Sequence, residues 1–231
     1  MKNILSLTIL LCLGCATAAA DSSEVLTAEK AGTPNSTLLA NPGEVLADAV
    51  IKASGGDHWP QLKTLDFTFN VAHDEKQLST VKHHWDLEAK TDTVEWNGKN
   101  VTVKLDEKND AGDAKAAYQR WVNDSYWLLA PLKLRDSGTH IADKGEQQVE
   151  GKTYRMLEMT FDHVGLTPGD KYHFYIDPAT NLVRRWDYMP TPEKTVSGTW
   201  EKYEDFGGLK LATEHEFGGK RIYFTGVAVK N

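Results

Sequence analysis

The feature that most constrains the fold is an alternation of apolar and polar residues that recurs in about eleven short segments. In the first segment, 65–71, Leu65, Phe67 and Phe69 alternate with polar neighbours, which is the pattern of a strand with one wet face. Further segments of strand character are 81–87, 93–96, 101–105, 141–150, 154–161, 172–177, 182–189, 196–205, 209–217 and 221–229. Turn-forming residues such as Asn97-Gly98 separate them. The sequence therefore predicts an antiparallel meander that must curl or close to bury its apolar face.

A helix is predicted ahead of these strands, over residues 43–54. Its buried face is expected to consist of five apolar side chains, Val45, Leu46, Ala49, Val50 and Ala53. The pair Gly55-Gly56 is a helix-ending signal. The ordered domain is therefore expected to begin near Pro42.

A second helical stretch, 113–134, interrupts the strands. Asn123 or Asp124 is expected to cap a separate short helix there, and Pro131 is expected to stop it. Because the stretch is rich in aromatic residues, we expect it to cover the open side or the end of the sheet. The block from Asn123 to Trp127 is interpreted as a structural lock between this cover and the sheet.

The first twenty residues have the form of a secretory signal peptide. Lys2 is the only charged residue, 4–13 is an apolar run, and small residues lead to Ala20. An apolar stretch of about ten residues is too short to remain as a membrane span. We therefore expect export across a bacterial inner membrane, a flexible linker over 21–42, and a single soluble domain over 43–231 in the periplasm.

Both cysteines, Cys12 and Cys15, lie in this signal segment, and two alternatives stay open. Cleavage after Ala20 would leave a chain without thiols, disulfides or thiolate metal sites. Alternatively, Leu13-Gly14-Cys15 resembles the end of a lipoprotein signal, in which Cys15 would be diacylated and would tether the protein to the outer membrane. Cys12 departs from that pattern, since an aliphatic residue is usual there.

Charge and motifs point away from several classes of function. A net charge of −7 is unfavourable for binding nucleic acid, whose phosphates require a basic face. The sequence contains no nucleophile elbow, phosphate-binding glycine loop or His-Glu-x-x-His motif. The eight histidines are scattered, and the neighbours His83 and His84 should point to opposite faces of a strand. We expect a monomer that is not an enzyme and needs no metal or cofactor.

Large rings on alternating positions are the best candidates for a binding site. The candidate lining residues of a cavity are Trp85, Trp121, Tyr126, Trp127, Phe174, Arg184 and Trp186. Rings line apolar cavities because each offers a large rigid surface at small entropic cost. A tightly packed core is the alternative. For Arg184, binding of an acidic head group inside the cavity competes with an ordinary ion pair to a neighbouring strand.

Several segments resemble secreted proteins related to the LolA/LolB lipoprotein carriers. The resemblance covers roughly residues 43–230. It is carried by Ala53–Gly56 with Trp59 and Leu62, by Arg120–Leu134 with Asp136–Gly138, by Phe161–Tyr172, and by Ile176–Pro178 with Leu182–Trp186. It implies an unclosed β-barrel of about eleven antiparallel strands, with helices across its open side over an apolar cavity. In the characterised carriers this cavity takes the acyl chains of lipoproteins.

The leading functional hypothesis is therefore an envelope protein that binds a lipid or a lipidated protein, in lipid or lipoprotein trafficking. The first alternative is a structural or interaction module tethered to the outer membrane, with a filled barrel and no ligand. The second is a hydrolase or metal-dependent enzyme whose histidines and aspartates converge in the fold.

Overall fold

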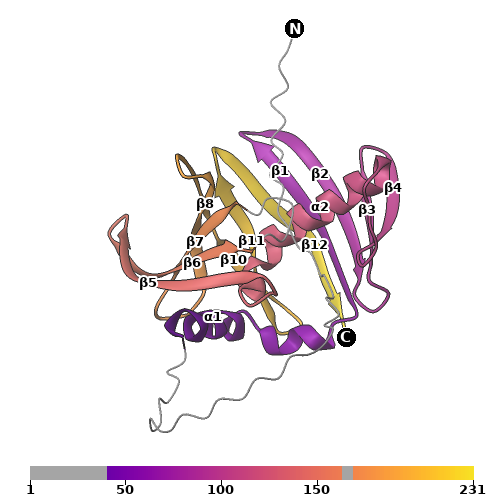
Figure 1. Cartoon of the computed structure of the whole chain (residues 1–231). Helices are drawn as coiled ribbons and strands as arrows, with labels where there is room; N and C mark the ends of the chain where they lie inside the picture. Colours follow the sequence, from indigo (N-terminus) through magenta and orange to yellow (C-terminus); the bar gives the residue numbers. More distant parts are fainter. Residues whose placement is uncertain (1–40, 163–168) are drawn as a thin grey trace, which may run out of the picture.

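The structure is a computed structural model that describes residues 41–162 and 169–231. The predicted signal peptide with Cys15, nearly all of the predicted linker 21–42, and part of the Phe161–Tyr172 segment lie outside the described residues. The described chain forms one curled antiparallel sheet with a few helices (Figure 1).

The strands follow the predicted segments closely. Their bounds are β1 Thr64–His73, β2 Lys76–Asp86, β3 Thr91–Trp96, β4 Lys99–Lys104, β5 Thr139–Val149, β6 Lys152–Phe161, β7 Lys171–Ile176, β8 Val183–Thr191, β9 Lys194–Thr199, β10 Glu201–Phe206, β11 Leu209–Phe217 and β12 Lys220–Lys230. The predicted hairpin at Asn97-Gly98 is confirmed. Both residues have positive φ, 48° and 75°, as a tight type I′ turn between β3 and β4 requires.

The sheet is open, which confirms the predicted unclosed antiparallel barrel. Its order is β4-β3-β2-β1-β12-β11-β9-β8-β7-β6-β5, with β10 paired to β11 beside this path. The first and last strands of the chain, β1 and β12, pair along most of their length in the middle of the sheet. The two ends of the order are β4 and β5, which are consecutive in the chain and joined by the helical stretch.

The sheet has twelve strands rather than eleven because the predicted strand 196–205 is divided at Trp200. This residue belongs to neither β9 nor β10, and Lys202 just after it has a positive φ of 49°. β9 pairs with β8 and shares a single register pair with β11, Gly198 and Phe217, whereas β10 pairs with the first half of β11. The alternation that runs from Val196 to Trp200 ends at the bend, since the next position in phase is the exposed Lys202.

The first helix, α1 (Pro42–Ala53), begins and ends as the sequence predicts. The Asn41 side chain accepts a hydrogen bond from the Gly43 N–H at 3.0 Å. Gly55 follows α1 in the left-handed conformation and opens the short 3₁₀ helix η1 (Gly56–Gln61). The expected buried face is partly wrong. Leu46 and Val50 are buried together with Ala47, whereas Val45 is 53% exposed, because the face of α1 that packs on β5 is rotated away from Val45.

The second helix, α2 (Gly112–Leu129), is one continuous helix. The predicted break at Asn123 or Asp124 is wrong, because the Asp124 carboxylate reaches a buried partner on the sheet instead of capping a helix. α2 ends before Pro131, which lies in the 3₁₀ helix η2 (Ala130–Lys133). As predicted, α2 covers the open side. It packs on β3, β4 and β11 and runs across the hollow of the sheet (Figure 1).

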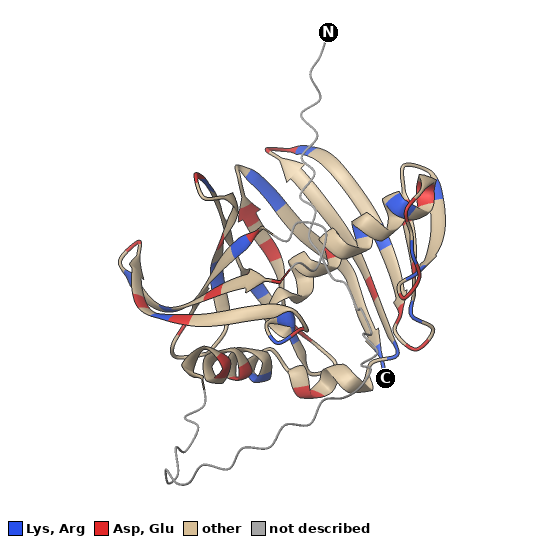
Figure 2. Cartoon of the chain, viewed as in Figure 1, with Lys and Arg blue, Asp and Glu red and all other residues tan. Residues whose placement is uncertain are grey.

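The main core lies between α2 and the facing side of the sheet. A smaller cluster of Val81, Val94, Trp96 and Val103 packs under Ala117, near the start of α2. Figure 2 shows Lys and Arg interspersed with Asp and Glu along the strands and turns.

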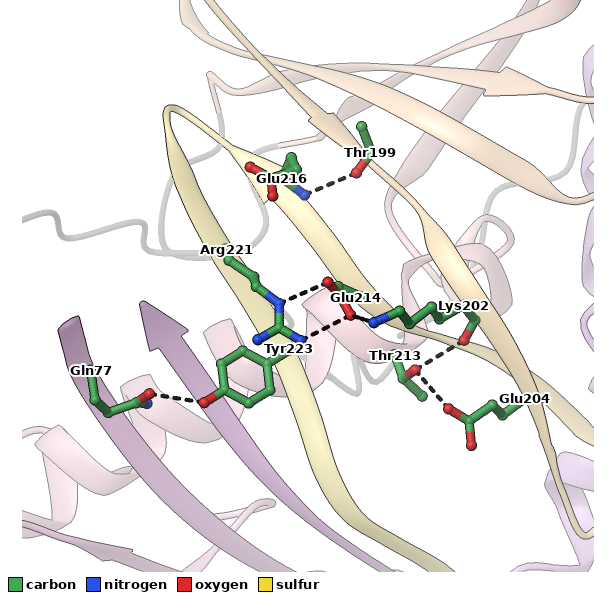
Figure 3. A network of polar contacts seen from close by, with 9 residues as sticks. All are labelled: Gln77, Thr199, Lys202, Glu204, Thr213, Glu214, Glu216, Arg221 and Tyr223. Atoms are coloured by element: carbon green, nitrogen blue, oxygen red, sulfur yellow. Dashed lines mark hydrogen bonds and ion pairs between the residues drawn. The ribbon is translucent and has the colours of Figure 1, made fainter. Parts of the chain in front are cut away.

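Ion pairs and hydrogen bonds connect neighbouring strands on the polar side of β10, β11 and β12 (Figure 3). Glu214 of β11 accepts hydrogen bonds from Arg221 of β12, at 2.7 and 3.0 Å, and pairs with Lys202 of β10. The hydrogen bond from Arg221 lowers the pKa of Glu214 to about 2. The Tyr223 hydroxyl donates to Gln77 of β2 at 2.9 Å. This network fixes the strands on the side away from the aromatic core.

Candidate functional site

Four of the predicted cavity residues meet in one aromatic cluster beneath α2. Trp186 of β8 lies at its centre, with its ring centroid 4.5 Å from that of Trp127 and 6.0 Å from those of Tyr126 and Phe174. Trp127 also contacts Phe217 of β11 at 4.8 Å. α2 thus contributes two rings, and β7, β8 and β11 contribute one ring each.

Two more predicted residues form a second group toward the start of α2. The rings of Trp85 on β2 and Trp121 on α2 meet edge to face, with centroids 5.1 Å apart. Trp59 of η1 and Tyr118 of α2 flank them at 5.7 and 5.6 Å. Both groups belong to the same continuous core.

Arg184 does not join these rings. Its guanidinium forms an ion pair with Asp177 at 3.6 Å and lies over the ring of Tyr203, 5.5 Å from the centroid. The arginine side chain is about a third exposed. The structure therefore matches the ion-pair alternative, and Arg184 is not placed to hold a head group among the six aromatic candidates.

The six predicted rings contact other rings and are almost fully buried. Trp127 and Trp186 are each 1% exposed, and Phe174 is 0% exposed. A guest that enters among them must separate α2 from the sheet or displace rings.

Four ring nitrogens in this interior have no hydrogen-bond partner among the described residues. They are Nε1 of Trp121, Trp186 and Trp200, and Nε2 of His215. Trp200 contacts two of the other three rings, with its ring centroid 5.5 Å from that of Trp186 and 4.5 Å from that of His215. Buried tryptophan N–H groups usually have a partner, and each one left without costs about 1–3 kcal/mol. The interior is therefore aromatic, but it also contains ring nitrogens that can form hydrogen bonds.

His215 supplies an acceptor in this group. Its Nδ1–H donates to the Thr199 carbonyl at 2.9 Å, so Nε2 carries the lone pair of a neutral imidazole. Burial lowers the pKa of His215 to about 4, against the smaller opposing effect of that hydrogen bond. The ring is therefore uncharged near pH 7.

A cavity of about 190 Å³ opens at the surface where β9 and β11 share their single residue pair. It is lined by Arg185, Ser197, Gly198, Thr199, Glu216, Phe217, Gly218 and Gly219. Phe217 also contacts Trp127 of the aromatic cluster. The cluster thus reaches the edge of this opening.

A buried charged group lies at the other end of the interior, and sequence reasoning missed it. His83 of β2 is enclosed between Asp92 of β3 and Asp124 of α2, with N–O distances of 2.7 and 3.1 Å. Burial favours a low pKa for His83, but its hydrogen bonds to Asp124 and Asp92 outweigh that effect and raise the pKa to about 9. His84 points to the other face, as predicted, and contacts Asp66.

The signal for this group was present in the alternation itself. His83 lies between Val81 and Trp85 on the inward face of β2, and Asp92 precedes Val94 on the inward face of β3. A polar residue in register with buried apolar ones requires a buried partner. The predicted lock between α2 and the sheet is confirmed, because Asp124 and Trp127 both contact strand residues.

The described part of the chain contains no group of three or more His, Cys, Asp or Glu side chains arranged to hold a metal ion. Among the same residues, no helix is both long and apolar enough to cross a membrane.

Comparison with known proteins places the chain in a family. Residues 67–216 match the model of a family of unknown function, DUF6503. The chain belongs to this family. No curated protein matches it.

Solved structures with a related arrangement include a DUF1329 family protein from Desulfovibrio piger. It is 12% identical, with a TM-score of 0.49, over 83% of this chain and 94% of that one. A LolA superfamily protein from Nitrosomonas europaea is 8% identical, with a TM-score of 0.49, over 80% and 94%. An outer membrane lipoprotein-sorting protein domain from Vibrio parahaemolyticus is 7% identical, with a TM-score of 0.45, over 80% and 94%. The LolA superfamily is the group that the sequence resembles.

Proposed function

We propose that this DUF6503 family member binds a lipid, or the acyl chain of a lipidated protein, in the aromatic interior between α2 and the sheet. The observation that carries the proposal is the pair of unpartnered N–H groups on Trp186 and Trp200, whose buried rings contact each other. An ester or amide at the end of an acyl chain offers a carbonyl acceptor to the tryptophan N–H groups. The chain itself suits the rings.

The energetics favour a long apolar ligand. Each methylene group moved from water into the interior contributes about 0.8 kcal/mol. Entry requires separation of rings that now contact each other, including the pair Trp127 and Trp186. A short or strongly charged ligand would gain too little to offset that separation. The gain rises with each added methylene, so a long acyl chain offsets that separation better than a short one.

The cell envelope is the proposed location, and it rests on the signal-like residues 1–20. The protein is then either free in the periplasm or anchored to the outer membrane through an acylated Cys15. Membrane fractionation of a Cys15→Ala variant separates these two forms.

Uptake of a fluorescent fatty acid tests the proposal. Protein that has been delipidated in denaturant and refolded should bind the probe saturably, and protein isolated from a bacterial envelope should co-purify with extractable lipid. If neither occurs with folded protein, the proposal is wrong.

A matched pair of variants tests the role of the ring nitrogens. Trp200→Phe removes one N–H group and keeps a ring, so the affinity for the probe should fall about five-fold, as expected for one lost hydrogen bond. Trp96→Phe is the control, because Trp96 packs in the separate small cluster under Ala117. Its affinity should equal that of the wild type.

A second candidate function is a structural or interaction module whose barrel interior is permanently filled. The exposure of 1% or less at Trp127, Phe174 and Trp186 favours it. Under this alternative the refolded protein takes up no probe.

A further inference from the structure

The buried contact between His83, Asp92 and Asp124 joins three elements through one imidazole ring. Nδ1 faces an Asp92 oxygen at 2.7 Å, and Nε2 faces an Asp124 oxygen at 3.1 Å. The side chains of His83 and Asp92 are completely buried, and that of Asp124 is 4% exposed. This is the charged contact by which the middle of α2 is held to β2 and β3.

With both carboxylates ionised, this geometry calls for a proton on each ring nitrogen. An ionised carboxylate only accepts hydrogen bonds, so each of the two aspartates needs an N–H from His83. A neutral imidazole has one N–H and would turn a lone pair toward the other carboxylate. The second oxygen of Asp92 has no partner among the described residues, so Asp92 depends on His83 for its pairing.

Few other groups face this ring. From β1, Phe67 stacks on it with a centroid distance of 4.5 Å and does not titrate. On α2, the Asn123 amide donates to the other oxygen of Asp124 at 2.8 Å. The nearest cation on the same helix, Arg120, lies over the Trp96 ring instead. The charge balance of the contact is therefore decided by Asp92 on β3, Asp124 on α2 and the proton of His83.

We propose that His83 is a proton-operated clamp, which holds α2 on the sheet while the ring is charged and releases the middle of α2 when it loses a proton. A buried carboxylate left without its donor is costly, so Asp124 would move to water and take its part of α2 with it. The clamp rests on the proposed function in one respect, because release of α2 would open the route to the aromatic interior.

The pKa of His83, raised to about 9, sets the range in which release is expected. The contact is closed at neutral pH and opens as the pH rises through about 9. Removal of the Asp124 carboxylate takes away the group whose release opens the contact, so the opening should then be lost.

Thiol labelling measures the opening directly. In the full chain with Cys12→Ser and Cys15→Ser, the replacement Ser125→Cys puts a single thiol on the buried side of α2, next to Asp124. A second reporter, Val183→Cys, sits in the buried start of β8 and detects global unfolding. Labelling rates are divided by the rate of a free thiol at the same pH.

The corrected labelling rate at Ser125→Cys should rise at least ten-fold between pH 7.5 and 10, with a midpoint near 9, while the rate at Val183→Cys stays low. Asp124→Asn should keep the labelling rate low across this range, because its amide can pair with the neutral ring and no carboxylate is left to move to water. His84→Gln is the control, since that histidine lies on the opposite face of β2, and its midpoint should equal that of the wild type.

A flat profile at Ser125→Cys in the wild-type background would overturn the clamp, and so would an alkaline rise in labelling that Asp124→Asn leaves unchanged. The wild-type profile needs no variant at the clamp, so poor folding of Asp124→Asn leaves that test intact. If the labelling rate follows the expected pH profile but the protein takes up no fatty acid at any pH, the clamp is supported and only the proposed function is contradicted. Uptake of the fatty acid together with a flat labelling profile would support the proposed function and count against the clamp.

Discussion

Two buried histidines, His83 and His215, differ in charge near pH 7 because their neighbours differ. His83 faces two carboxylates, and its pKa is raised to about 9. His215 lies among rings and a carbonyl group, and burial lowers its pKa to about 4. Each therefore ties the stability of the fold to pH, in opposite directions.

The free energy of unfolding should be greatest near pH 6.5 and fall on both sides. Below 6.5 the contribution of His83 is fully present, and it is lost as the pH rises from 6.5 through about 9. For His215, stability is lost as the pH falls from 6.5 toward about 4, because only the unfolded chain binds the proton there. Each effect is on the order of 3 kcal/mol at most.

Urea unfolding at intervals from pH 5 to 9 measures this curve. His83→Gln should flatten the alkaline side, and His215→Leu should flatten the acid side. A stability that rises or falls steadily across the whole range would show that one of the two charge states is misassigned.

At the level of single residues, the sequence predicted which aromatic side chains lie inside, since alternation fixes the inward positions of a strand. It did not predict that Trp85 and Trp121 would form a group apart from Trp127 and Trp186. Nor did it pair Asp92 with His83. Both depend on distances between elements that are remote in the chain, and no local pattern encodes such distances.

The same limit explains the differences at the scale of elements. The sequence predicted α1, α2 and most strands because each of these elements has one buried face, which gives its apolar residues a regular spacing. The break at Trp200 was missed although the alternation of Val196, Gly198 and Trp200 ends at Lys202, because the change of pairing partner from β8 to β11 leaves no mark in the local pattern. Asp124 resembled a helix cap in sequence, and only its distance to His83 shows its partner.

The junction between α1 and the β10–β11 turn leads to a prediction at this scale. Gly55 has a φ of 79°, and a Cβ there would lie 2.0 Å from the Gly208 carbonyl oxygen. Gly55→Ala should therefore lower the free energy of unfolding by roughly 3 kcal/mol or more, from backbone strain and this clash together.

Gly151→Ala is the matched control. Gly151 has nearly the same φ, 77°, but a Cβ there would meet nothing within 4 Å. Only the cost of the left-handed conformation remains, about 1–2 kcal/mol. Chemical denaturation of both variants gives the difference, and equal losses would mean that the close approach to Gly208 is not maintained.

For the whole molecule, the chain order explains how one helix can serve as a cover. β4 and β5 are the two ends of the open sheet and are consecutive in sequence, so the segment that joins them must cross the opening. α2 is that segment. It carries Trp121, Tyr126 and Trp127 on the side that meets the strands. On the proposal made above, access to this interior therefore depends on the position of one connecting helix.

Trp127→Ala tests the central claim most directly, with fatty-acid affinity and stability measured on the same preparation. If the aromatic interior holds a ligand, the variant should bind the fluorescent fatty acid at least ten-fold more weakly than the wild type. It should also lose about 3–5 kcal/mol of stability, as for a buried large aromatic side chain. Two results would contradict the claim, each with the same loss of stability in Trp127→Ala. In one, neither the variant nor the wild type binds the probe, and in the other both bind it equally well. The interior would then be a filled core, and α2 a fixed part of it.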